Sequence, residues 1–262
     1  METAFDAIGI EITNETAFNN LAEDVEKRGE ASYLTRKLGV LHGRCLKLGA
    51  GLEIWTVLYE TVAGEVSCAD CRPAFRARFS QKISPWILTE TDEEGKAIVH
   101  GFVEGFDTEV LFELQNLTEM GTEVFKRNSL QIGLCGLAYS AKVLEKAETS
   151  YWKSFDEIAL NVIADENIWS LCGRIIAFET LRNPFSGNDL YWLYLDLGEL
   201  KLEILVNRRI LQTEKIAVGK FVRAEVWLQG HIVGEITKRF GYEGVDRSHR
   251  TVDFWKQFKK LN

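Results

Sequence analysis

The sequence predicts an α+β protein that is mainly antiparallel β, with a small barrel in its C-terminal half. Three observations lead to this class. Apolar, β-branched and aromatic residues alternate with polar ones in short runs from residue 43 to residue 233. The clearest helix of the first half covers only residues 15–28. The 262 residues suffice for one large domain or two ordinary ones. We therefore expect an α+β domain with an antiparallel sheet at residues 1–150, and a small barrel-like domain with a C-terminal helix at residues 151–262.

Composition and charge narrow the class of protein. The chain is 46% hydrophobic and 27% charged, as is usual for globular proteins. Charges interrupt every apolar run, so we expect no membrane span, and the first residues do not resemble a secretory signal. Five cysteines, an odd number, suit a reducing compartment, and we expect a cytoplasmic protein. Residues 1–165 hold 16 basic and 27 acidic residues, and residues 166–262 hold 15 and 12. This balance permits nucleic-acid binding but does not favour it.

The predicted helix at residues 15–28 has a signal at each end. Its apolar residues recur at helical spacing, and charged residues occupy the other side. Asn14 is suited to the N-cap, and Gly29 to the position just after the last turn. Lys27 and Arg28 lie where positive charge stabilises a helix dipole. We expect this helix to pack on a sheet.

The strands of the first half are predicted from their composition. Residues 44–48 and 52–60 read as a hairpin around Gly49-Ala-Gly51. Further strand-like runs are at residues 74–79, 97–103 and 109–114. The continuous apolar run at 129–144 fits either a buried strand pair or a helix broken by glycines, and the two alternatives stay open. The pattern is lost at residues 145–168, where we place the connection between the two halves.

Alternation in the second half assigns its side chains to two faces. Val222, Ala224, Val226 and Leu228 are all apolar and are expected to point into a barrel. The neighbouring positions, together with their counterparts on the preceding strands, then lie outside. The expected outer residues are Trp192, Tyr194, Lys201, Phe221, Arg223 and Trp227.

This layout resembles an OB-fold module. The resemblance rests on Gly173-Arg-Ile175, the Asn183-Pro-Phe-Ser-Gly187 loop and Val218-Gly-Lys-Phe-Val-Arg223 before the closing strand, and it covers about 65 residues. It implies that the outer aromatic face binds a ligand by stacking on bases or sugars. In a protein of two parts the same face is equally suited to contact with the other half. Both alternatives stay open.

One group of residues has spacing typical of a metal site. His42-x-x-Cys45 is followed by Cys68-x-x-Cys71, and zinc prefers four such ligands in a tetrahedron. However, Cys45 lies in a predicted strand, where residues 42 and 45 point to opposite faces. A redox pair of Cys68 and Cys71, or ordinary thiols, are the alternatives. No other cofactor is expected.

Function is the least constrained property of this sequence. No nucleophile, phosphate-loop, zinc-protease or dinucleotide motif occurs, so no catalytic residue is assigned. We expect a non-catalytic binding or scaffolding protein, with a protein partner or a second copy as possible partners and no membrane. The alternatives are a binder of single-stranded nucleic acid or oligosaccharide that uses the aromatic face, and an enzyme with a site between the halves. Near the end, Phe254, Trp255 and Phe258 predict a short helix that docks its aromatic rings.

Overall fold

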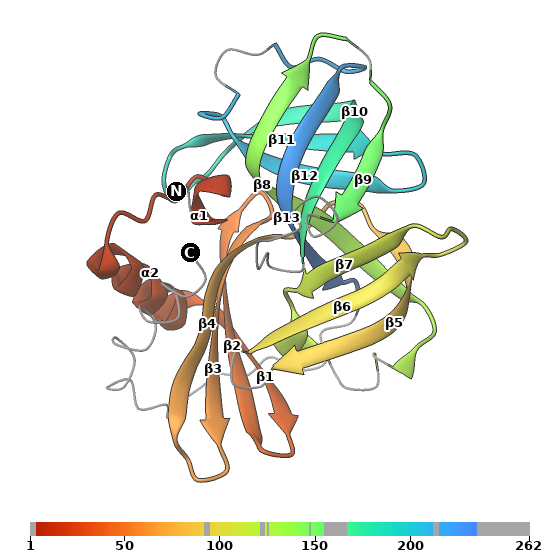
Figure 1. Ribbon diagram of the computed structural model, residues 1–262. Helices are drawn as coiled ribbons and strands as arrows, with labels where there is room; N and C mark the ends of the chain where they lie inside the picture. The colour runs from red at the N-terminus through yellow and green to blue at the C-terminus, as the bar shows by residue number, and fades with distance from the viewer. Residues whose placement is uncertain are drawn as a thin grey trace, which may run out of the picture.

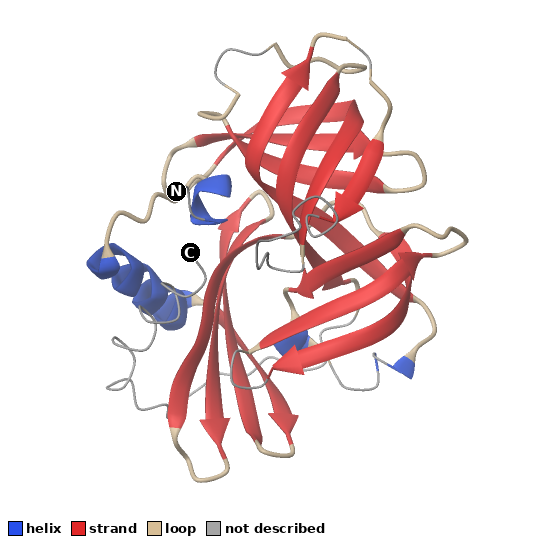
Figure 2. Ribbon diagram, viewed as in Figure 1, coloured by secondary structure: helices blue, strands red, loops and turns tan. Residues whose placement is uncertain are grey.

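The computed structural model describes residues 4–91, 95–120, 124, 126–146, 148–154, 167–211 and 215–234. The described chain consists mostly of strands with few helices (Figure 2), so the predicted class, α+β and mainly antiparallel, is confirmed. One sheet has four strands and the other has nine. None of the helices in the described part combines the length and hydrophobicity needed to span a bilayer. The helix predicted around Phe254 falls outside the described residues.

The N-terminal region contains two helices and an antiparallel meander (Figure 1). The helices are α1 (Ala4–Ala7) and α2 (Glu15–Arg28), and the strands are β1 (Glu30–Arg36), β2 (Gly39–Gly49), β3 (Leu52–Thr61) and β4 (Val66–Phe75). Helix α2 has the predicted bounds, and Asn14 Oδ1 accepts a hydrogen bond from Ala17 N at 2.9 Å. Gly29 follows the helix in an extended conformation. A Cβ there would lie 2.5 Å from Val25 O, so close packing accounts for this glycine.

The nine-stranded sheet contains a closed ring in the C-terminal half. Its strands are β5 (Gln81–Thr91), β6 (Lys96–Val103), β7 (Glu109–Leu114), β8 (Leu130–Leu144), β9 (Tyr151–Ser154), β10 (Ile168–Arg182), β11 (Asp189–Asp196), β12 (Lys201–Asn207) and β13 (Phe221–Ile232), and the short helix η2 (Leu117–Glu119) follows β7. Strands β10, β11, β12, β8 and β13 pair in that order, and β13 pairs with β10 to close the ring. We call this the C-terminal ring.

A second closed ring shares two of these strands. Strands β5, β6, β7, β13 and β8 also pair in order, and β8 pairs back with β5. We call this the N-terminal ring. Each ring has one parallel pair, β12 with β8 or β7 with β13, and the remaining pairs are antiparallel. Strand β8, on the N-terminal side of the predicted boundary at residue 150, therefore contributes to both rings.

The shared strands carry matching glycines where the rings meet. Leu134-Cys-Gly136 on β8 faces Leu228-Gln-Gly230 on β13, and Cys135 pairs with Gln229. A Cβ on Gly136 would lie 2.8 Å from Val226, and one on Gly230 would enter the ring of Phe112. The Val226 contact, together with the His231 ring 2.3 Å from a Cβ placed on Gly133, explains why glycines interrupt the apolar run at 129–144. That run forms one continuous strand rather than a strand pair or a helix.

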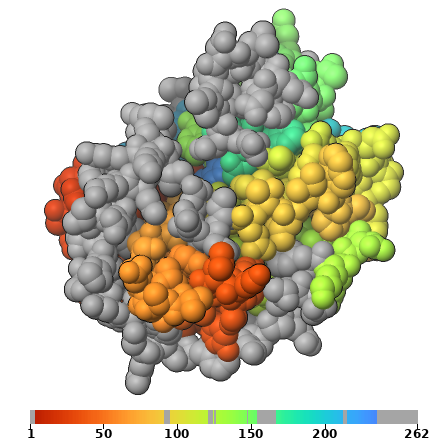
Figure 3. Space-filling view, turned by 60° about the horizontal axis from the view of Figure 1, so that its bottom comes forward, coloured from red at the N-terminus to blue at the C-terminus, as the bar shows by residue number. Residues whose placement is uncertain are grey.

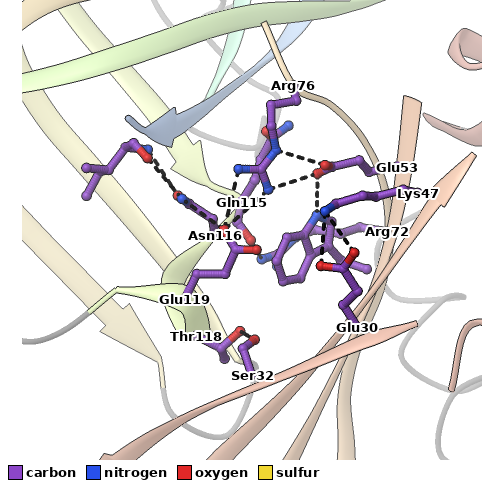
Figure 4. Close-up of polar contacts among 12 residues, drawn as sticks. Glu30, Ser32, Lys47, Glu53, Arg72, Arg76, Gln115, Asn116, Thr118 and Glu119 are labelled. Carbon is purple, nitrogen blue, oxygen red and sulfur yellow. Dashed lines mark hydrogen bonds and ion pairs between the residues drawn. The ribbon is translucent and has the colours of Figure 1, made fainter. Parts of the chain in front are cut away.

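Two different layers join the four-stranded sheet to the rings. One face of the sheet, with α1 and α2, packs its apolar side chains on Leu137, Trp192 and Leu205 of the C-terminal ring. The other face places Val57, Tyr59 and Ala69 in the core of the rings, and it also meets β7, η2 and β13 through buried polar side chains (Figure 4). There Arg72 pairs with Asp70 and Glu113, while Arg76 pairs with Glu53 and Glu119. The part of the outer face of the C-terminal ring around Trp192 and Leu205 is thus an internal contact, whereas Phe178 on β10 and Glu225 on β13 are exposed.

His231, at the edge of this polar layer, is expected to make stability depend on pH. Burial, reinforced by the Arg76 guanidinium, lowers the pKa of His231 to about 3. An unfolded histidine binds a proton below about pH 6.5 while the folded one does not, so stability falls as the pH falls from 6.5 towards 3. The expected loss at about pH 4.5 is roughly 2–3 kcal/mol. Urea denaturation across this range measures it, and His231→Gln should flatten the profile. Equal slopes for both proteins would contradict the assignment.

Candidate functional site

The predicted outer aromatic face is mostly covered. Alternation assigned the sides correctly, because Val222, Val226 and their neighbours fill the ring. However, Trp192 is only 5% exposed, so its expected exposure is wrong. Its indole donates to Glu203 Oε2 at 2.6 Å, and the Arg78 guanidinium lies 4.4 Å from its ring centre. The segment between β4 and β5 thus lies over this face, with the Phe79 ring stacked on Tyr194 at 4.6 Å.

The other residues of that predicted face do not complete an open surface around Trp192. Lys201 is exposed and borders a small recess beside Tyr194. Phe221, Arg223 and Trp227 lie on β13, which strand β10 separates from β11. Arg223 is engaged by Glu148 at 2.7 Å, and Trp227 packs against the apolar layer under the four-stranded sheet. Among the described aromatic side chains, the most exposed tryptophan lies elsewhere.

The predicted metal ligands are not brought together. Cys45 is buried with Trp55 and Ala74 on one face of the sheet, whereas Cys68 belongs to the apolar layer on the other face. His42 Nε2 lies 2.7 Å from Glu60 Oε2. Burial raises the pKa of the Cys45 and Cys71 thiols, which opposes the thiolate form that zinc binds. Among the described residues, no three His, Cys, Asp or Glu side chains are grouped as a metal site.

An exposed aromatic cluster lies instead on the outside of the N-terminal ring. Trp86 is 67% exposed, and its ring centre lies 5.1 Å from that of His100 and 6.3 Å from that of Phe102. We call these three residues the aromatic face. Figure 3 shows that residues of β5 and β6 (yellow) lie at the surface on this side of the molecule. A tryptophan with this exposure marks a surface suited to binding.

A β-bulge directs Trp86 outward. Pro85 pairs with Gly101 and Ile87 with His100, so Trp86 is the extra residue on β5. A bulge re-aims a side chain and is a common device next to functional sites. Proline lacks the N–H that a regular ladder needs and is tolerated in strands at bulges. A Cβ on Gly101 would lie 2.6 Å from Ser84 O, so glycine permits the close approach of the two strands here.

A groove of about 790 Å³ adjoins the aromatic face. The link is Glu109 on β7, whose carboxylate lies 2.5 Å from His100 Nε2 and which also lines the groove. The walls come from the β6–β7 loop, the start of β7, β9, Trp169 and the β11–β12 loop. Both loops occupy the same place in their rings, between the second and third strands. We call this cavity the tryptophan groove.

Two stacked indoles build one wall of the tryptophan groove. The rings of Trp152 and Trp169 are 4.1 Å apart and inclined by 9°. Strand β7 pairs with β13 only at residues 113–114, so its earlier carbonyls have no strand partner on that side. The indole of Trp152 donates to Glu109 O and that of Trp169 to Leu111 O, each at 2.9 Å. These bonds fix the rings and satisfy the carbonyls.

The tryptophan groove is acidic. Asp107, Glu109 and Glu199 line it, and Lys153 is the one basic side chain among its described residues. Thr108 Oγ1 donates to Glu199 and so ties the two hairpin loops together. Carboxylates in a concave site raise the local concentration of cations and repel anions. The groove and the aromatic face together form the candidate site.

Sequence reasoning did not find this site. The predicted run at 74–79 ends four residues after β4 does, and β5 was not predicted, because Pro85 and polar residues break its alternation. The Pro85-Trp86 pair was the available signal, since proline in a strand indicates a bulge or an edge. Comparison of the chain with protein-family models, curated proteins and solved structures gives no significant match.

Proposed function

We propose that this chain is a non-catalytic binding protein that holds an extended ligand across the aromatic face and the tryptophan groove. The observation that carries the proposal is the exposure of Trp86, turned outward by a β-bulge beside His100 and Phe102. Tryptophan is one of the side chains enriched in binding hot spots. His100 Nε2 lies 2.5 Å from the Glu109 carboxylate, and Pro85 restricts the backbone of β5, so ligand binding would order few further groups here.

The fold of the N-terminal ring supports the same surface. OB-folds are five-stranded barrels that bind oligonucleotides and oligosaccharides on the face of their second and third strands. In the N-terminal ring these are β6 and β7, which carry His100, Phe102, Glu109 and Leu111. The OB-like character expected in the second half thus extends, as part of this proposal, to a ring whose corresponding face is open. Single-stranded nucleic acid is the less favoured ligand, because carboxylates rather than basic residues adjoin this face.

Trp86→Ala is expected to abolish binding without destabilising the fold. The side chain is mostly in solvent, so the free energy of unfolding should change by less than about 0.5 kcal/mol. Loss of a stacking partner typically removes about 1–3 kcal/mol of binding free energy, which is roughly tenfold or more in affinity. Urea denaturation and titration measure the two effects. Phe178→Ala, at a side chain 42% exposed on β10, is the matched control and should change neither quantity.

The titration uses three probes because each represents one class of extended ligand. They are cellohexaose, a twelve-residue oligothymidylate and a hexapeptide of alternating arginine and glycine. Binding is followed through the NMR signals of the tryptophan indoles. We expect one probe to shift the Trp86 signal in a saturable manner. The Trp86→Ala variant should bind that probe with at least tenfold lower affinity. No saturable shift with any of the three, or unchanged affinity in Trp86→Ala, would overturn the proposal.

A further inference from the structure

We infer that the tryptophan groove accepts a cationic side chain, so that the ligand is a basic segment of polypeptide. This inference rests on the proposed function, because it names the ligand class of the same site. It goes further in assigning separate roles to the two parts. The aromatic face stacks on a planar group of the segment, such as a guanidinium or a peptide bond, and the groove holds an arginine or lysine side chain.

The charge of the tryptophan groove is the first support. Its lining carries three carboxylates, on Asp107, Glu109 and Glu199, against the single ammonium of Lys153. They come from both hairpin loops and from the start of β7, and the bond from Thr108 to Glu199 brings the two loops together at the groove. No hydrogen bond or ion pair within the described chain engages Asp107, whose carboxylate is exposed. A phosphate backbone would be repelled here, whereas a guanidinium or ammonium group would be attracted.

The aromatic wall is the second support. Trp152 lines the groove, and its position is fixed by stacking on Trp169 and by its bond to Glu109 O. An indole attracts a cation over its face, and a planar guanidinium stacks on it. Nearby carbonyls of Glu109 and Leu111 are already taken by the two indoles. Polar recognition of a ligand therefore falls mainly on the carboxylates, which accept hydrogen bonds from a cation.

Size and continuity are the third support. The groove volume of about 790 Å³ suits a side chain with its flanking backbone, since ligand sites of about 300–1,000 Å³ are usual. Glu109 and Leu111 on β7 lie next to Phe102 and His100, their register partners on β6, on the outer side of the N-terminal ring. A segment with its basic side chain in the groove would therefore continue over the aromatic face. A neutral glycan would make no use of the three carboxylates as counter-charges.

The experiment compares two peptides that differ only in charge. The probe is an acetylated, amidated hexapeptide of alternating arginine and glycine, and its partner contains citrulline in place of arginine. Citrulline keeps the planar shape and removes the positive charge. Isothermal titration at two salt concentrations should show at least tenfold weaker binding of the citrulline peptide. Affinity for the arginine peptide should also fall as salt rises.

Two double variants separate the groove from the general acidity of the protein. The variant Glu109→Gln with Glu199→Gln removes two groove carboxylates and should lower the affinity for the arginine peptide at least tenfold. The control, Glu179→Gln with Glu225→Gln, removes the same charge from the outer sides of β10 and β13 and should alter affinity less than twofold. Melting curves verify that both variants fold. Equal weakening by the two variants, or equal affinity of the citrulline peptide, would overturn the inference.

The two proposals can fail separately. If cellohexaose shifts the Trp86 indole signal and the arginine peptide does not bind, the ligand class is wrong and the binding face stands. If the arginine peptide binds but Trp86→Ala has no effect on it, the aromatic face is wrong while the groove stands. If no probe binds, both proposals fail.

Discussion

Replacing Arg72 with alanine is expected to lower the free energy of unfolding by about 3–5 kcal/mol. The Arg72 side chain is only 3% exposed and pairs with the equally buried carboxylates of Asp70 and Glu113, the latter at 2.9 Å. Both carboxylates contact Nη1, and Nη2 donates to Leu114 O and Gln115 O, each at 3.3 Å. Burial opposes the charge on Arg72, but the two carboxylates outweigh it and raise its pKa. Removing the guanidinium leaves two buried acids without their counter-charge.

Urea denaturation of Arg72→Ala measures this effect, and a surface arginine gives the matched control. Arg208 pairs with Asp189 at 2.7 Å, but both side chains are exposed. Exposed ion pairs contribute about 0–1 kcal/mol to stability. The free energy of unfolding of Arg208→Ala should therefore be close to that of the unsubstituted protein. If Arg72→Ala were no more destabilising than Arg208→Ala, the buried polar layer would not hold the sheet to the rings.

Trp192→Ala is expected to lower the free energy of unfolding by a similar amount, about 3–5 kcal/mol. Its ring belongs to the apolar layer under the four-stranded sheet and lies beneath the Arg78 guanidinium. The substitution also removes a hydrogen bond to Glu203, a buried carboxylate that then keeps its backbone donors, Phe79 N at 2.7 Å and the backbone of Arg78. Truncation therefore has two costs: it leaves a cavity, and it leaves the buried Glu203 carboxylate with one hydrogen bond fewer.

Thermal and urea unfolding of Trp192→Ala should be compared with those of Trp86→Ala. Both variants lose the same atoms, but only the first loses them from the interior. A loss below about 1 kcal/mol for Trp192→Ala would mean that the segment around Phe79 does not cover this face in solution. The expectation that Trp192 stacks on a ligand would then be open again.

Local patterns predicted the regular parts of this fold. The spacing of apolar residues and Asn14 gave both ends of α2, and alternation along residues 222–228 gave the inner side of β13. These signals depend only on neighbours in the chain. The structure of the 129–144 run could not be predicted, because its glycines are required by close contacts with Val226 and His231. These two residues are 90 or more positions away in the chain.

The sequence predicted that an aromatic surface would lie on the outside of a barrel, but it did not predict which strands carry that surface. An outer aromatic face was expected, and one exists, but it lies on the other ring. Alternation shows that Trp192 points out of its barrel, yet it does not show that another sheet lies there. Trp86 was passed over because a bulge and a proline disturb the period of β5. The groove forms only where two hairpin loops from distant parts of the chain meet, and no short motif marks such a place.

The sharing of β8 and β13 by both rings bears on how the chain acquires its structure. Both rings contain β8 and β13, so neither ring can close unless these two strands have paired. The pairing of β8 with β13 joins segments about 90 residues apart. Loss of that pairing would open both barrels, so we expect melting as a single cooperative unit, reached slowly because distant contacts must form first. A fragment ending before β13 would expose unpaired strand edges and would be prone to aggregation.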